Sequence, residues 1–142
     1  MTEGPPRKIV TARRKARKRA MDVLYESEMR GAEVLDVLQQ KVARAEPPIS
    51  DYTSTLVNGV VEHQARIDEL LTTYAQDWSL ERMPPVDRNI LRVATYELLW
   101  CDDIDTPVAI SEAVELAKSL STDDSPRFIN GLLDRIANQA TP

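Results

Sequence analysis

Several residue types are scarce in this chain of 142 residues, and each shortage excludes a class of protein. A single cysteine, Cys101, cannot form an internal disulfide, and with only one histidine, His63, beside it there are too few ligands for a zinc site of the usual kind. No apolar stretch approaches the roughly 20 residues that a membrane span needs. The basic N-terminus also lacks the apolar run of a secretory signal. We therefore expect a cytoplasmic protein with no membrane association and no bound cofactor.

Glycine is also scarce, which bears on the fold class. The four glycines (Gly4, Gly31, Gly59 and Gly131) offer little for hairpin turns, and no segment alternates apolar and polar residues over a strand's length. Hydrophobic residues at 42% and charged residues at 29% are typical of a folded globular chain. The sequence predicts an all-α, compact, single-domain bundle of about six to seven helices.

Apolar residues recur at helical spacing in six segments of the chain. Residues 1–10, with Gly4, Pro5 and Pro6, show no period and predict a flexible lead-in before a domain of residues 11–142. Thr11 is the expected N-cap of the first helix and Gly31 its C-cap. The apolar positions expected on the buried faces are Ala16, Ala20, Val23 and Leu24; Leu35, Leu38 and Val42; Tyr52, Leu56, Val60, His63, Ile67, Leu70, Leu71 and Tyr74; Ile90, Leu91, Ala94, Leu98 and Cys101; Ala113, Leu116, Ala117 and Leu120; and Phe128, Leu132, Leu133 and Ile136.

Charge is distributed very unevenly along the chain. Residues 1–19 hold eight Lys or Arg and one acid, Glu3, so this segment carries +7 while the remainder carries −12 to give the net charge of −5. A basic arm on an acidic body favours a polyanionic partner for the arm, most commonly a nucleic acid. The acidic body offers a surface on which a basic protein could dock.

The basic arm coincides with the first predicted helix. On a helical wheel, Arg14, Lys18 and Tyr25 share one narrow sector, opposite the alanine stripe. Lysine and arginine there can span RNA phosphates, and a tyrosine ring gives a base a surface for stacking. Six Lys or Arg within seven positions also repel one another at i, i+3 and i+4 unless a polyanion offsets the repulsion.

Other interpretations of this helix stay open at this point. A run of Lys and Arg is often no more than a solvated helix face, and such helices also bind DNA, acidic lipid surfaces and acidic proteins. A membrane-surface helix would need large apolar residues opposite the charges, where this sequence has mostly alanine.

No residue pattern favours catalysis. The phosphate-loop, dinucleotide, nucleophile-elbow and zinc-protease motifs are absent from the sequence. His63 falls in an apolar row and is expected to be a partly buried, hydrogen-bonded structural residue. Asp123 and Asp124 stand just before Ser125 and Pro126, the expected N-cap and first residue of the last helix, where carboxylates are favoured by the helix dipole. We therefore expect a protein that is not an enzyme.

Two long segments resemble a known family. The segments VDRNILRVATYELLW (86–100) and TPVAISEAVELAKSLSTDDSPRFINGLLD (106–134), together with the N-terminal ARRKARKRAMDVLYESE, are similar to the NusB family pattern over about residues 12–137. The resemblance implies a non-catalytic helical protein that binds box A RNA of nascent ribosomal RNA transcripts. It does so together with NusE, a small-subunit ribosomal protein, within an antitermination complex on RNA polymerase.

The resemblance also implies roles for individual residues. Basic side chains that would contact phosphates are Arg13, Arg14, Lys15, Arg17 and Lys18, and candidate aromatic contacts are Tyr25, Tyr74 and Phe128. Asp124 would lie near the RNA or partner surface, and Asp87 opens the helix presented to NusE. For Tyr74 and Phe128, core packing is the competing interpretation, because an aromatic at helical spacing is usually buried.

Trp78 and the Pro84–Pro85 linker depart from some relatives, and family members occur as monomers and dimers, so a homodimer is possible. Two rival functions stay open. The same helical domain resembles the N-terminal part of some ribosomal RNA methyltransferases, although no glycine-rich cofactor domain follows it here. Alternatively, the protein is purely structural and its self-association occludes the RNA site.

Overall fold

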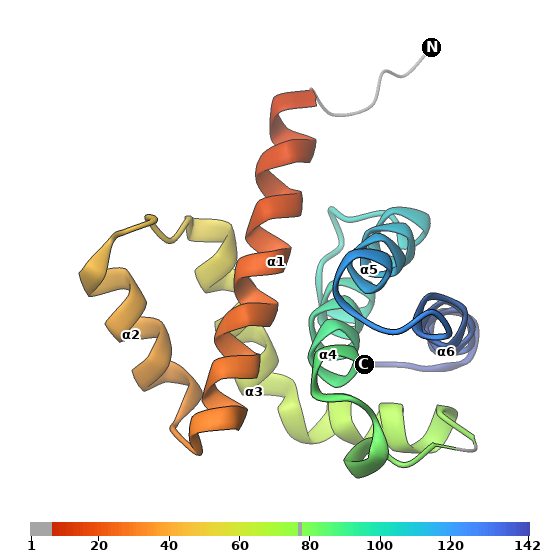
Figure 1. Ribbon diagram of the computed structural model, residues 1–142. Helices are drawn as coiled ribbons and strands as arrows, with labels where there is room; N and C mark the ends of the chain where they lie inside the picture. Colours follow the sequence, from red (N-terminus) through yellow and green to blue (C-terminus); the bar gives the residue numbers. More distant parts are fainter. Residues whose placement is uncertain (1–6, 77) are drawn as a thin grey trace.

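The first helix, α1 (Arg7–Arg30), runs through the middle of the view in Figure 1. The computed structural model describes residues 7–76 and 78–142. Within them, α1 is followed by α2 (Val34–Arg44), α3 (Asp51–Tyr74), the short 3-10 helix η1 (Leu80–Arg82), α4 (Pro85–Trp100), α5 (Thr106–Leu120) and α6 (Ser125–Gln139). The described part of the chain contains no strand, which confirms the predicted all-α class.

The helix ends follow local sequence signals. The Ser50 hydroxyl accepts a hydrogen bond from the Thr53 amide at 3.2 Å, as expected for an N-cap. Gly31 adopts φ +65° where α1 ends, a conformation that glycine reaches without the steric cost of a Cβ. Pro85 occupies the first turn of α4, where its missing N–H costs no hydrogen bond.

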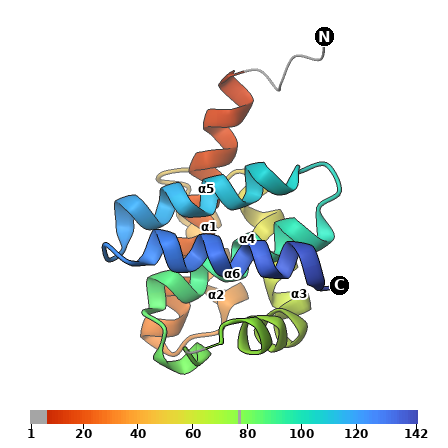
Figure 2. The same cartoon turned by 90° about the vertical axis from the view of Figure 1, so that its right-hand side faces the viewer.

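Helices α1, α3 and α4 pack together at the centre, and α5 and α6 cover the other side of α4 (Figure 1). Figure 2 shows α5 and α6 lying side by side and antiparallel across one face of the molecule. One continuous core joins all six α-helices; among its completely buried side chains are Val23, Val37, Leu56, Leu71, Leu91, Leu133 and Ile136. None of the described helices is long and apolar enough to cross a membrane.

Three local expectations about helix ends and faces are wrong. The first helix begins at Arg7 rather than after Thr11, so residues 7–10 of the expected lead-in are helical; residues 1–6 lie outside the described part. In α2 the buried residues are Val37 and Leu38, while Leu35 and Val42 remain 40% and 51% exposed. The last helix has Asp124 at its N-cap position, one residue earlier than the expected Ser125.

Candidate nucleic-acid interface

Helix α1 extends with its first turns beyond the helices that pack around the rest of its length (Figures 1 and 2). On its outward face, the side chains of Arg14 and Lys18 are 58% and 51% exposed, and Lys15 between them is exposed as well. Tyr25 lies farther along the helix and is 37% exposed. The structure thus presents three cations and one aromatic ring to solvent on the helix where the sequence predicts them.

Arg14 is exposed but already engaged. Its Nε donates to Glu112 Oε2 at 2.9 Å and its Nη2 to Glu112 Oε1 at 3.1 Å, a bidentate pair that joins α1 to α5. The hydrogen bonds and charge of Glu112 raise the pKa of Arg14. Because Glu112 is only 6% exposed, its negative charge is compensated mainly by the ion pair with Arg14.

Lys15 and Lys18 are freer than Arg14 to meet an anion. Lys18 pairs with Asp22 at 3.0 Å across one helical turn, an exposed contact of the kind that contributes little. Lys15 has no ion-pair partner among the described residues. Both lysines line a groove of about 300 Å³ between α1 and α5, and its other lining residues are Arg14, Glu112, Glu115, Leu116 and Ser119.

Arg17, one of the five basic residues assigned to phosphate contact, is buried instead. It is 3% exposed, and its Nε donates to Glu97 Oε1 on α4 at 2.8 Å. Burial acts to lower the pKa of Arg17, but the hydrogen bond and charge of Glu97 outweigh it and the pKa is raised. The hydroxyl of Tyr52 also donates to Glu97. Arg17 therefore holds α1 against α3 and α4, and in this structure it does not reach the surface.

Arg13 lies on the border between the exposed and the packed faces. Its guanidinium carbon lies 5.6 Å from the centre of the Tyr52 ring, a cation–π arrangement, and its Nη2 approaches Asp103 Oδ2 at 3.5 Å. The Arg13 side chain is 33% exposed, so part of it remains open to a ligand.

The two other candidate aromatic residues lie in a different part of the fold. Phe128, in the first turn of α6, packs edge-on against Trp78 with ring centres 5.0 Å apart. Tyr74 is the last residue of α3, and its carbonyl accepts a hydrogen bond from Arg135 at 3.0 Å. Both side chains are partly buried against the core, so each keeps an exposed portion. In the described structure, no ion pair or ring contact links either residue to the basic side chains of α1.

Asp87 is not available to a partner in this structure. It is completely buried, and its Oδ1 and Oδ2 accept hydrogen bonds from the Ser121 and Ser125 hydroxyls respectively, the latter at 2.7 Å. It thereby ties the start of α4 to the turn between α5 and α6. Asp124 is exposed, and its side chain makes no capping hydrogen bond, so it is free to meet a ligand.

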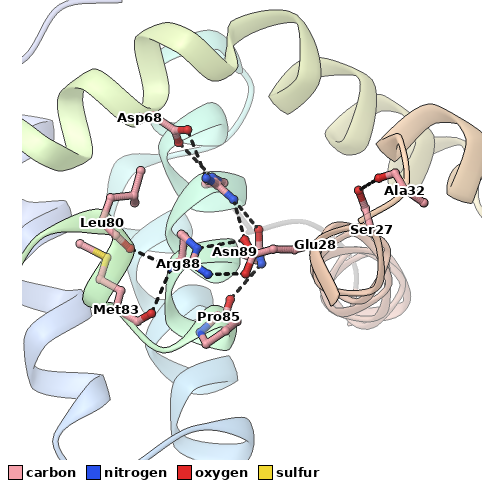
Figure 3. Close-up of polar contacts among 10 residues, drawn as sticks. Ser27, Glu28, Ala32, Asp68, Leu80, Met83, Pro85, Arg88 and Asn89 are labelled. Atoms are coloured by element: carbon pink, nitrogen blue, oxygen red, sulfur yellow. Dashed lines mark hydrogen bonds and ion pairs between the residues drawn. The ribbon is translucent and has the colours of Figure 1, made fainter. Parts of the chain in front are cut away.

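An ionic network that the sequence did not reveal joins the end of α1 to α4 and α3 (Figure 3). Glu28 pairs with Arg88, and also with Arg92 at 3.3 Å; Arg92 reaches Asp68 at 2.9 Å. Arg88 also donates to the carbonyls of Leu80 and Met83 at 2.8 and 3.1 Å, which holds η1 in place. The network positions α1 relative to the rest of the bundle.

The single histidine, His63, and the single cysteine, Cys101, are both partly buried. The His63 ring is partly buried, as expected, but the contact that holds it is stacking on Trp100, with ring centres 4.3 Å apart. Burial raises the pKa of Cys101 to about 11, which leaves this thiol poorly reactive at neutral pH. The described residues contain no group of three or more His, Cys, Asp or Glu side chains that could hold a metal ion.

Comparison with known proteins decides the family. The family model described as the NusB family matches residues 14–138. The chain belongs to the NusB family. A relative from Kineococcus radiotolerans named transcription antitermination protein NusB is 59% identical over 128 residues, which are 90% of this chain and 94% of the relative.

Two solved NusB-family structures agree with this assignment. T. maritima NusB superimposes with a TM-score of 0.82 at 35% identity, covering 99% of this chain and 96% of that one. A crystal structure of the antitermination factors NusB and NusE in complex with double-stranded RNA gives a TM-score of 0.78 at 27% identity, covering 89% of this chain and 96% of the matched chain.

Proposed function

We propose that this protein is a non-catalytic antitermination factor that binds box A RNA of nascent ribosomal RNA transcripts. It acts together with NusE in an antitermination complex on RNA polymerase. The observation that carries the proposal is the exposed, cationic face of α1, on which Lys15 has no ion-pair partner among the described residues and Lys18 pairs only with Asp22. Support comes also from the NusB–NusE–RNA complex, whose NusB chain shares this fold.

The proposed RNA contacts follow from exposure. Lys15 and Lys18 bind phosphates directly, while Arg13 and Arg14 contribute positive potential from positions already fixed by ion pairs. Tyr25 offers its ring to a base at the far end of the same face. Tyr74 and Phe128 would extend the RNA path only through their exposed portions, and Arg17 takes no part.

NusE is proposed to dock on the acidic body of the protein. Residues 20–142 carry a charge of −12, which favours association with a basic ribosomal protein. Asp124 is exposed and suited to such a contact, whereas buried Asp87 could serve only by shaping the turn that carries Asp124.

The proposal is tested by fluorescence anisotropy of a labelled box A RNA and of a scrambled RNA of equal length, each with and without NusE. We expect box A to bind more tightly than the scrambled RNA, and NusE to increase the difference. If both RNAs bind with equal affinity and NusE changes neither, the basic helix binds polyanions without sequence preference and the proposed function is wrong.

A further inference from the structure

The groove between α1 and α5 has two chemically different walls. The α1 wall consists of Arg14, Lys15 and Lys18, and the α5 wall consists of Glu112, Glu115, Leu116 and Ser119. Each set consists of residues that are adjacent or three to four positions apart in the sequence, so both helices turn a continuous face toward the groove. Its volume of about 300 Å³ is at the lower end of small-molecule sites, which leaves room for one planar group.

The α5 wall disfavours a phosphate inside the groove. Two carboxylates line it, and a phosphate close to them would meet like charge. The phosphate of a bound chain is therefore placed at the rim, where the exposed ammonium groups of Lys15 and Lys18 lie. The uncharged part of the nucleotide, its base, is the part that can enter.

The groups inside the groove suit a base that carries hydrogen-bond donors. Glu112 is occupied by Arg14, but Glu115 is 53% exposed and only its Oε1 is paired, with Lys118 at 3.2 Å. An ionised carboxylate accepts hydrogen bonds and donates none. Leu116, 9% exposed, supplies a small apolar surface to the same wall.

From these features we propose that the α1–α5 groove is a subsite for one unpaired RNA nucleotide and that Glu115 determines its specificity. Lys15 and Lys18 hold the flanking phosphates, Leu116 contacts the face of the base, and Glu115 accepts a hydrogen bond from an exocyclic amino group. Cytosine provides such a group; uracil presents a carbonyl oxygen at the same position and is disfavoured. This inference rests on the proposed RNA-binding function and adds a base preference to it.

The test compares 12-nucleotide oligo(C) and oligo(U) RNA in anisotropy titrations with the full-length protein. Wild type is expected to bind oligo(C) at least about five-fold more tightly than oligo(U), the low end of what one good base contact provides. Glu115→Gln should bring that ratio close to one, because a carboxamide both donates and accepts. Glu33→Gln, which removes an equal charge from an exposed position at the start of α2, is the matched control and should leave the ratio unchanged.

A second variant tests the groove independently of charge. Ser119→Phe places a ring in the groove from an exposed position near the end of α5 and should weaken oligo(C) binding while leaving the melting temperature unchanged. A wild-type ratio near one, or a ratio that Glu115→Gln does not change, would overturn the subsite while leaving RNA binding intact. Failure of every RNA to bind, box A with NusE included, would instead overturn the proposed function itself.

Discussion

Arg17 and Glu97 form an ion pair inside the protein, with 2.8 Å between Arg17 Nε and Glu97 Oε1 and side chains that are 4% and 1% exposed. The pair connects the basic helix to the centre of the bundle. An arginine in the middle of a cationic run therefore has a structural role that its neighbours Lys15 and Lys18 lack.

Arg17→Ala should destabilise the fold strongly, because it leaves Glu97 buried without its countercharge. We expect a loss of about 3–5 kcal/mol in the free energy of unfolding, measured by urea denaturation. Lys18→Ala, an exposed change one residue away, should stay within about 0.5 kcal/mol of wild type. The double variant Arg17→Met/Glu97→Leu should recover much of the loss, since it removes both charges together. An Arg17→Ala protein as stable as wild type would disprove the structural role.

Asp87→Ala should weaken the junction between α4 and the α5–α6 turn. It removes the acceptor of two hydroxyl groups, that of buried Ser125 and that of partly buried Ser121, at an expected cost of about 1–3 kcal/mol in unfolding free energy. Thermal denaturation followed by circular dichroism measures the loss. Asp124→Ala, exposed in the same region, should melt as wild type does; equal melting of both variants would contradict the account of Asp87.

Two helical glycines should respond in opposite ways to alanine. A Cβ on Gly59 would overlap the ring of Tyr96, so Gly59→Ala must displace the ring and should cost about 1–3 kcal/mol in unfolding free energy. At Gly131 the nearest atom is Arg135 Nη1 at 3.5 Å, and Gly131→Ala should raise stability by up to about 1 kcal/mol through helix propensity. Chemical denaturation of the two variants compares them directly, and a stabilising Gly59→Ala would show that α3 and α4 pack less closely than described.

Lowering the pH should remove part of the contribution that Glu28 makes to the free energy of unfolding. Although partial burial acts to raise the pKa of Glu28, the hydrogen bonds and charges of Arg88 and Arg92 outweigh it and lower the pKa below 4.5. The stabilisation is thus present above the unfolded-state pKa and is lost as pH falls through the lower folded-state value. Unfolding free energies of wild type and Glu28→Gln should differ at pH 7, and the difference should shrink as the pH falls below about 4.5, whereas Glu33→Gln should match wild type at pH 7. A difference that stays constant between pH 7 and pH 3 would argue against the ionic network.

Much of the fold could be predicted from the sequence because the residues that begin and end the helices act through local chemistry. Ser50, Gly31 and Pro85 mark helix ends through their own backbone or capping chemistry, and the long apolar row of α3 predicts its central position. The start of α1 at Arg7 was missed because no capping residue marks it. In α2 the expected burial of Leu38 is confirmed, but Leu35 and Val42 were misassigned because the short helix buries Val37 beside Leu38 instead of the i, i+3, i+7 row.

The candidate site was harder to predict because charge alone does not indicate burial. Arg17 stands three and four residues before Ala20 and Met21, which places it on the packed face, and this spacing was the available signal. Its partner Glu97 is 80 residues away on α4. Arg14 has the exposure expected of it, but its pairing with Glu112 on α5 depends on tertiary packing that one sequence does not display.

RNA is proposed to lie on the exposed lysines of α1, and the salt dependence of box A binding tests this placement most directly. Each phosphate contact on a single strand contributes about 0.7 to the slope of log affinity against log salt concentration. Lys15→Ala/Lys18→Ala should therefore flatten that slope by about 1.4 and weaken binding, with the melting temperature unchanged. A slope equal to that of wild type would show that the phosphates bind elsewhere and would contradict the placement of RNA on this helix.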